Sequence, residues 1–546
     1  MTLTPLGQVH PIRAFAPPQV LGLNEQTQDL LNELVVQWAW KLPRNLERMI
    51  YLDAKNTLDD LGVSLPPSLV DRLDVVVGWP EKAVYEVANR IVFERILSPD
   101  DSRDPFDLKR VLYDNRFAIE FPQAVASSLA QSCAFVSTTP GDVAEGEAPA
   151  LIMFHSALWS TGIWDRRRRA LRGGMLISEV DKMGLPVEIT VMTPAEHVVC
   201  AKGSQGWYVS AVIPHALGRT PMEILPFRPT TDRPFGRSRI DRTVMSLTNR
   251  AVRAGARLEV HSELFTSMKL LLLGADEEAF KDASGKMVPL WSFFLGRMNM
   301  LSKDEDGDTP ELEIIRSESP EPHIAIGRDL ASKFSGHTGV PMSSLGISTD
   351  NPESQGAKQE ARQDIIVDVE KQHVIYSDAL LRTFENAIMI RDNMTTPPEG
   401  ILDLSFKWRR GDRPSLVSIA DAGTKQVSAI PSLADTTVGM ELVGMEPDQI
   451  DRAESELRRR RGSDSLNSIL DRATGATSPE ELGGASVTED AAAIKAKADA
   501  LGVLIRAGVD PEEAARRVGL SGLEFTGATP VALRLPESQA RSLEER

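Results

Sequence analysis

Apolar residues recur with helical spacing over most of the chain, interrupted by one long stretch that alternates like strands. Over 24–43, apolar positions lie three or four residues apart, which predicts an amphipathic helix. Residues 81–97 and 122–140 show similar spacing and predict two further helices. Residues 149–230 instead alternate between apolar and polar positions, with turn residues between the runs, and predict strands. The first 230 residues therefore predict an α+β body.

Long helical patterns dominate the chain beyond this body. In the first of them, Val244, Leu247 and Ala251 fall on one stripe, and a helix of that length would extend about 50 Å at 1.5 Å per residue. The last of them begins at Asn351, a favourable N-cap, followed by Pro352. The predicted elements are helices over 237–271, 323–335 and 352–393, a strand over 401–409 that must find its partner elsewhere in the chain, and helices over 414–461.

Composition narrows the class of protein. A chain of 546 residues with 42% hydrophobic and 25% charged residues is expected to form several folded parts. Its formal net charge of −17 does not favour tight nucleic-acid binding unless basic residues are gathered locally. Two cysteines indicate a reducing compartment, and neither a membrane span nor a secretory signal is visible, so synthesis in the cytosol is expected.

Motifs that carry catalysis or ligand binding fail on spacing. An EF-hand loop starting at Asp304 would place Thr309 at the glycine position and Ile315 at the bidentate glutamate position. A phosphate loop ending at Lys286 would place Phe280 at its first glycine. His197 precedes Cys200 by three residues without a second ligand pair, so a metal site is disfavoured. No catalytic residue, metal or cofactor is predicted.

Two arginine clusters, 165–174 and 458–462, leave alternatives open. Either could bind DNA or a partner protein, remain solvated near glutamates, or pair with a neighbouring acidic subunit. The segment 510–520 resembles part of a helix-turn-helix, although a short helix beside glycine is more often structural. Residues 462–490 are rich in serine, glycine and threonine and are typical of a linker.

The order of these elements, with several local motifs, resembles the portal proteins of tailed double-stranded DNA phages, especially those of actinobacterial phages. The motifs are "YLDAKNTLDDLGVSLP", "DVVVGWPEKAVYEVANR", "RPFGRSRI", "LLLGADEEAF", "SPEPHIA" and "TGVPMSSLGISTDNPESQGAKQEAR". They extend over nearly the whole chain, and their order is more specific than any one of them. Gly356 departs from the pattern, because the family commonly has a helix-favouring residue near this position.

The resemblance implies a mainly helical, ring-forming portal fold with wing, stem, clip and crown domains. The implied divisions are an N-terminal arm (1–23), an α+β wing (24–232), stem helix one (233–273), a clip (274–320), stem helix two (321–338), a tunnel loop (339–351), a long wing helix with a returning strand (352–412), crown helices (413–461), and a linker with a C-terminal helical tail (462–546).

The resemblance also implies where such a ring would contact its cargo and partners. A loop facing moving DNA should touch it weakly, and small hydroxyl and amide side chains offer sequence-indifferent contacts to phosphate or sugar. The expected DNA-facing tunnel-loop residues are Ser343, Ser344, Gly346, Ser348, Thr349 and Asn351; the candidate channel-facing stem residues are Arg239, Arg242, Arg250 and Arg253; the candidate terminase-contacting clip residues are Asp304, Glu305, Asp306 and Asp308.

The implied function is a non-enzymatic ring, usually dodecameric in this family, at one capsid vertex of the virion, through which double-stranded DNA is packaged and ejected. Its implied partners are copies of itself, the DNA, the terminase large subunit, the major capsid protein, a head–tail adaptor and a scaffold, with no membrane. The alternatives are another virion structural protein, such as a capsid or connector subunit, and a packaging ATPase or nuclease. The missing phosphate loop and carboxylate cluster argue against the enzyme.

Overall fold

The computed structural model is α+β and divides into two compact units, residues 1–413 and 414–546, each described by itself. The described residues are 12–57, 75–98, 104–265, 269–273, 311–315, 318–347, 362–412, 416–434, 436–446, 448–460 and 516. The predicted start at Asn351, the 462–490 linker and the 510–520 segment lie wholly or mostly outside them.

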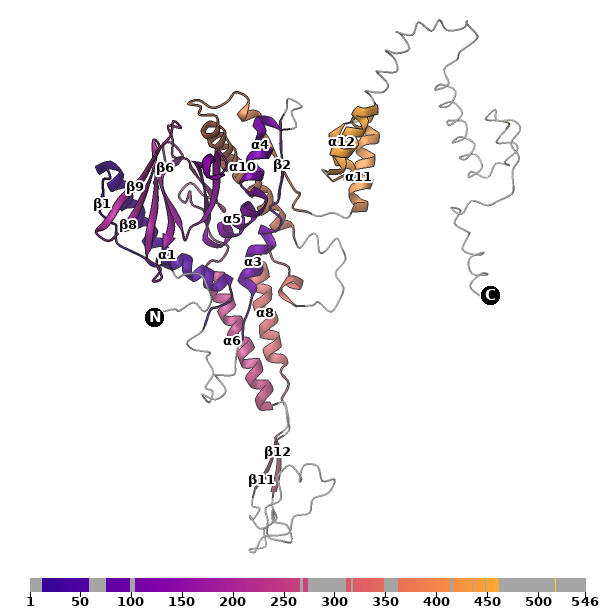
Figure 1. The fold of residues 1–546 in the computed structure, drawn as a ribbon. Helices are drawn as coiled ribbons and strands as arrows, with labels where there is room; N and C mark the ends of the chain where they lie inside the picture. Colours follow the sequence, from indigo (N-terminus) through magenta and orange to yellow (C-terminus); the bar gives the residue numbers. More distant parts are fainter. Residues whose placement is uncertain are drawn as a thin grey trace, which may run out of the picture. The chain divides into compact units, whose positions relative to one another are not determined.

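A six-stranded sheet forms one part of the first unit, and the predicted strands within 149–230 are confirmed (Figure 1). Its strand order is β1-β9-β8-β7-β6-β5, with β1 parallel to β9 and every other neighbouring pair antiparallel. The bounds are β1 Val20–Leu21, β5 Ser160–Asp165, β6 Ala170–Val180, β7 Pro186–Met192, β8 Glu196–Gly203 and β9 Gly206–Pro214.

Helix α1, Glu25–Leu52, packs on this sheet. It begins where the sequence predicted, because the Asn24 side chain accepts a hydrogen bond from the Thr27 N–H at 2.7 Å. The predicted end at Pro43 is wrong. Pro43 is exposed and lies inside the helix, while the second half is held by burial of residues on both sides of it, including Leu42 and Asn45.

A three-stranded antiparallel sheet, β10-β3-β4, forms the centre of a second core with α5 and α10. The Tyr376 hydroxyl on α10 donates to Ser128 Oγ on α5 at 2.8 Å, and Ser128 Oγ donates to the Leu225 carbonyl on β10. The bounds are α5 Phe117–Gln131, β3 Cys133–Pro140, η2 Val143–Glu145, β4 Ala150–Ser156, β10 Met222–Pro226 and α10 Gln363–Arg391.

The predicted strand over 401–409 is confirmed as β13, Ser405–Trp408, and it pairs antiparallel with β2, Phe93–Leu97. The predicted helix over 81–97 is therefore wrong in its second half. The chain is helical in α3, Trp79–Ala88, and then forms strand β2. Residues 122–140 are likewise helical only up to Gln131 and continue as strand β3. Short elements complete this region: η1 Pro105–Asp107, α4 Leu108–Asp114 and η5 Ile401–Asp403.

Two helices, α6 and α8, run side by side (Figure 1). Helix α6 is Arg242–Phe265, shorter at both ends than predicted, and α8 is Glu321–Thr338, slightly longer than predicted. Between them in sequence, β11 (Lys269–Leu273) pairs antiparallel with β12 (Glu311–Ile315), so that residues 274–310 leave and re-enter at adjacent strand ends.

In the second unit, the predicted helices are found in α11, Leu416–Ala429, and α12, Thr437–Val443, with η6, Pro431–Leu433, between them. Residues 448–460 are also helical. Helices α11 and α12 approach closely at Gly423, where an added Cβ would lie 2.0 Å from the Leu442 carbonyl oxygen.

Candidate functional site

The α6–α8 pair is antiparallel and is joined at both ends by side chains. At one end, His337 Nε2 lies 2.9 Å from Asp241 Oδ2. At the other end, the rings of His261 and His323 are 5.1 Å apart. Between these ends the helices bury small and branched residues, which are Val244, Leu247, Ala251 and Ala254 on α6 and Leu330, Ala331 and Phe334 on α8.

The four arginines that the sequence placed on this helix separate into three environments. Arg242 and Arg250 are exposed, and Arg253 is half-buried. Arg239 corrects the prediction: its side chain is only 4% exposed and it precedes the first residue of α6, so it faces the interior of its own unit. Arg257, which is also exposed, lies seven residues after Arg250 and therefore about two helical turns along the same face.

Arg239 joins four elements through one guanidinium. It donates to the Ala83 carbonyl on α3 and to the Thr338 carbonyl at the end of α8, each at 2.5 Å. It also lies 3.4 Å from the Asp368 carboxylate on α10, and Arg228 pairs with the same carboxylate. Burial lowers the pKa of Arg239 to about 10, partly offset by Asp368, so the group is charged at neutral pH.

The "RPFGRSRI" segment (233–240), which leads into α6, is locked against α5 and the chain before it. Gly236 has φ +70°, and a Cβ there would lie 2.2 Å from the Phe227 carbonyl oxygen. Ser238 Oγ donates to the Ala130 carbonyl, and the Arg239 N–H donates to the Leu129 carbonyl at 2.8 Å. We call residues 233–240 the junction segment, because it fixes where the α6–α8 pair leaves the body.

The described part of the predicted loop is a short 3-10 turn, η4, Met342–Leu345. Ser343 and Gly346 are exposed and Ser344 is half-buried, whereas Leu345 packs against the core. Gly346 closes the turn at φ +84°, and nothing lies within 4 Å of a Cβ added there.

The ends of the longer excursion that contains this turn lie close together. Helix α8 ends at Thr338 and is capped by Gly339, whose φ is +73°. The Gly339 N–H donates to the Ser335 carbonyl at 2.8 Å. A Cβ built on Gly339 would lie 3.4 Å from Ile365 Cγ1, near the start of α10. The end of α8 and the start of α10 are therefore close together.

Several predicted site residues lie outside the described residues. They are Ser348, Thr349 and Asn351 of the predicted loop and Asp304, Glu305, Asp306 and Asp308 of the insertion. The β11–β12 pair that bounds this insertion is described.

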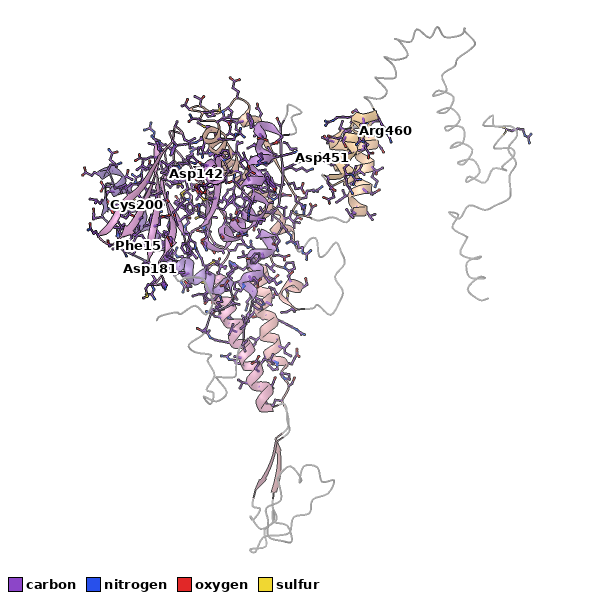
Figure 2. All side chains as sticks on the ribbon, in the orientation of Figure 1. Phe15, Asp142, Asp181, Cys200, Asp451 and Arg460 are labelled. Carbon is purple, nitrogen blue, oxygen red and sulfur yellow. The ribbon has the colours of Figure 1, made fainter. Side chains whose placement is uncertain are left out.

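The histidines and cysteines offer no metal centre among the described residues. Cys133 and Cys200 are both buried free thiols, and Cys200 lies on the six-stranded sheet (Figure 2). His197, on β8, faces His215 with ring centroids 4.9 Å apart. Burial lowers the pKa of His197 to about 4, with a further contribution from His215, which keeps the ring neutral. Within the described part of the chain, no helix is long and apolar enough to cross a membrane.

Two curated relatives match the region that contains these elements. The portal protein of Mycobacterium phage L5 is 24% identical over 381 residues, which is 69% of this chain and 77% of the relative. The portal protein of Mycobacterium phage D29 is 22% identical over 380 residues, with the same two coverages. The chain is similar to phage portal proteins. The resemblance predicted from the ordered motifs is confirmed, although no family model matches the chain.

Solved structures give a weaker likeness. The neck of a native gene transfer agent particle, computed with C12 symmetry, matches with a TM-score of 0.35 and 12% identity over 73% of this chain and 99% of that one. The neck of an empty particle, computed with C6 symmetry, matches with a TM-score of 0.34 and 14% identity over 73% and 99%. We draw no argument from likenesses of this size.

Proposed function

We propose that this chain is a portal protein. Identical copies form a dodecameric ring at one vertex of a phage capsid, and double-stranded DNA enters and leaves through the ring. The observation that carries the proposal is the similarity to phage portal proteins over 69% of this chain and 77% of each relative. The ring has a structural role without chemistry of its own and resides in the virion after synthesis in the host cytoplasm.

The arrangement of elements supports a division of labour within each subunit. The α6–α8 pair serves as the stem, residues 24–232 with α10 and β13 as the wing, and the helices after residue 413 as the crown. The excursion bounded by β11 and β12 serves as the clip, with Asp304, Glu305, Asp306 and Asp308 offered to the terminase large subunit. The ends of the first segment are adjacent because β11 pairs with β12, and the ends of the second are adjacent because Gly339 lies near Ile365. Each segment can therefore reach a partner while its ends stay fixed.

Exposure selects which residues meet the DNA in this proposal. On the turn after the stem, Ser343 and Gly346 are exposed and Ser344 is half-buried, and these three residues contact the duplex weakly. Ser348, Thr349 and Asn351 lie outside the described residues, and their place in the sequence supports the same role for them. Arg242 and Arg250 remain candidates on the stem because they are exposed, and Arg253 is a weaker one. The capsid protein, a head–tail adaptor and a scaffold complete the set of proposed partners.

Negative-stain electron microscopy of the purified chain tests the proposal. Class averages down the particle axis should show rings with an open channel of duplex width. If the chain stays monomeric alone, the measurement is repeated with capsid and scaffold proteins. A chain that forms no ring under either condition contradicts the proposed function.

A further inference from the structure

A large basic pocket lies on the first unit where α1, the end of α5 and the junction segment meet. Its volume is about 860 Å³, and the end of α8 completes its wall. Seven lysine and arginine side chains line it, against two carboxylates, although the chain as a whole has a net charge of −17. The local charge is thus opposite to that of the chain.

Three of the seven cations are already engaged within the unit. Arg228 and Arg239 share the Asp368 carboxylate. Arg48 donates to Asn45 Oδ1 at 3.3 Å and to the Gln131 carbonyl at 3.0 Å. These contacts occupy Arg48, Arg228 and Arg239, and four of the seven cations take no part in them.

The other four cations, Lys41, Arg44, Arg233 and Arg237, form no ion pair with any described residue. The Lys41 ammonium lies 4.2 Å from the centroid of the Phe235 ring, and burial lowers its pKa. Of the two carboxylates, Asp241 is taken by His337. Lys41 is half-buried, whereas Arg44, Arg233 and Arg237 are exposed. A half-buried ammonium without a carboxylate is unfavourable in the isolated unit, so an anion from outside would stabilise Lys41.

The shape of the site favours a protein side chain over a duplex. Double-stranded DNA presents its phosphates on a stiff, wide cylinder that can lie across the mouth of a pocket but cannot enter it. Trp40 stands at the rim with 74% exposure, and the Arg44 guanidinium carbon lies 6.0 Å from its ring. Exposed tryptophan and arginine together are typical of the anchors of protein–protein interfaces.

We propose that the basic pocket receives carboxylate side chains of a second copy of this chain and forms one half of the contact between adjacent subunits. The chain itself supplies the anions, because it has 78 acidic against 61 basic residues. A ring contact joins two different surfaces of the same subunit, so every pocket can be filled by carboxylates on another surface of the next copy. This inference rests on the proposed ring.

Charge reversal at the rim is the first test. Arg44 is exposed, so Arg44→Glu should leave the subunit folded while placing like charges opposite each other at the interface. The concentration needed for half-assembly, measured by sedimentation at low salt, should rise at least roughly tenfold. Lys182→Glu is the matched control, since Lys182 is exposed between β6 and β7, outside the pocket, and the change in net charge is the same.

Zero-length cross-linking identifies the occupant. A carbodiimide joins the Lys41 amine only to a carboxylate in direct contact, and a mixture of ¹⁴N- and ¹⁵N-labelled chains distinguishes links between copies from links within one. We expect Lys41 joined to an aspartate or glutamate of the other isotope in assembled rings. Lys41→Met, which keeps the aliphatic stem, should remove this link.

The outcomes separate this inference from the proposed function. Rings that survive Arg44→Glu unchanged, with Lys41 linked only within its own chain, overturn the pocket inference and leave the ring intact. Rings that survive while the Arg44→Glu variant alone loses DNA binding assign the pocket to DNA instead. A wild-type chain that never assembles overturns both proposals.

Discussion

The Arg239 guanidinium lies 3.4 Å from the Asp368 carboxylate, although the two residues are 129 positions apart in sequence. The same guanidinium donates hydrogen bonds to the Ala83 and Thr338 carbonyl oxygens. One buried cation thus joins α3, α8 and α10 at the point where the chain enters α6. This contact gives the α6–α8 pair a fixed origin on the body, as the stem of the proposed ring requires.

Removing this cation should destabilise the first unit strongly. Arg239→Met leaves the Ala83 and Thr338 carbonyl oxygens without their buried donor and leaves Asp368 with Arg228 alone, and each orphaned buried acceptor costs about 1–3 kcal/mol. Urea unfolding measures the difference. Arg172→Ala is the control, because the Arg172–Glu33 pair is half exposed on both sides and should contribute less than about 1 kcal/mol. Equal losses for the two variants would contradict the joining role of Arg239.

The junction segment should also be intolerant of a single methyl group. Gly236→Ala forces a Cβ to within 2.2 Å of the Phe227 carbonyl oxygen and keeps a left-handed backbone. Gly218 has a similar φ of +66° but nothing within 4 Å, so Gly218→Ala isolates the backbone cost of about 1–2 kcal/mol. Gly236→Ala should exceed that cost by roughly 1–3 kcal/mol of overpacking, measured by thermal unfolding. If the two variants match, the close approach at Gly236 is unimportant.

The sequence located two kinds of element correctly: strands that pair with their neighbours in sequence, and helices with a long apolar repeat. The strands within 149–230 mostly pair with their neighbours in sequence, so their alternation is visible in a short window. Strand β2 was mistaken for helix because its partner, β13, lies some three hundred residues further along the chain. Strand β3 is buried on both faces over nearly its whole length, and such an apolar run cannot be told from a buried helix by spacing.

The environment of Arg239 was missed for a different reason. The helical stripe begins near Ile240, and spacing alone extended the helix back to residue 237. A signal was present in Asp241, whose Oδ1 accepts a hydrogen bond from the Val244 N–H at 2.9 Å, as an N-cap does. Reading that cap would have placed Arg239 before the helix. Its burial still depends on Asp368, whose approach no local pattern reveals.

Acid should destabilise the first unit, in part through His197. Burial holds the pKa of His197 at about 4, against 6.5 for the unfolded group. Between these values the unfolded chain binds a proton that the folded chain does not, so stability falls as the pH falls from about 6.5 to about 4. His197→Leu should remove on the order of 2 kcal/mol of the acid-dependent loss. Unfolding free energies at pH 7 and pH 4.5 provide the measurement.

The control for His197 replaces a buried residue of the same sheet that does not titrate. Ile189→Leu, on strand β7, should leave the loss between pH 7 and pH 4.5 close to its wild-type value, because no proton binds at this position. His155 and His373, whose pKa values burial also lowers to about 4, keep part of the acid sensitivity in every variant. An unchanged pH dependence in His197→Leu would show that the ring is not held neutral in the folded unit.

Glu223 should give the first unit the opposite pH dependence, with stability falling as the pH rises. Burial raises its pKa from 4.5 to about 7, despite the nearby Arg382 and Arg219. Stability from this group is therefore complete below pH 4.5 and is lost as the pH rises through 7. Glu223→Gln should stabilise the first unit at pH 8 by on the order of 2 kcal/mol relative to wild type, and the difference should vanish near pH 4.5. A stabilisation that is constant over this range would contradict the assignment.

A positive charge at Ser343 should raise the affinity of the proposed ring for duplex DNA and the salt dependence of that affinity. Ser343 is exposed on the turn after α8, and in the proposed ring this turn faces the duplex. Each phosphate that a lysine neutralises adds about 0.9 to the slope of log affinity against log salt. Assembled rings with Ser343→Lys should therefore bind duplex DNA more tightly at low salt and with a steeper salt slope, measured by fluorescence anisotropy.

Ser343→Gln separates charge from length, since it extends the side chain without adding a cation. Its salt slope should match that of the wild-type ring, because a neutral amide releases no counterion. If Ser343→Lys and Ser343→Gln give the same curve while both still form rings, the turn does not face the duplex. The contact would then have to come from another part of the channel, and the exposed Arg242 and Arg250 of α6 would be the next residues to replace.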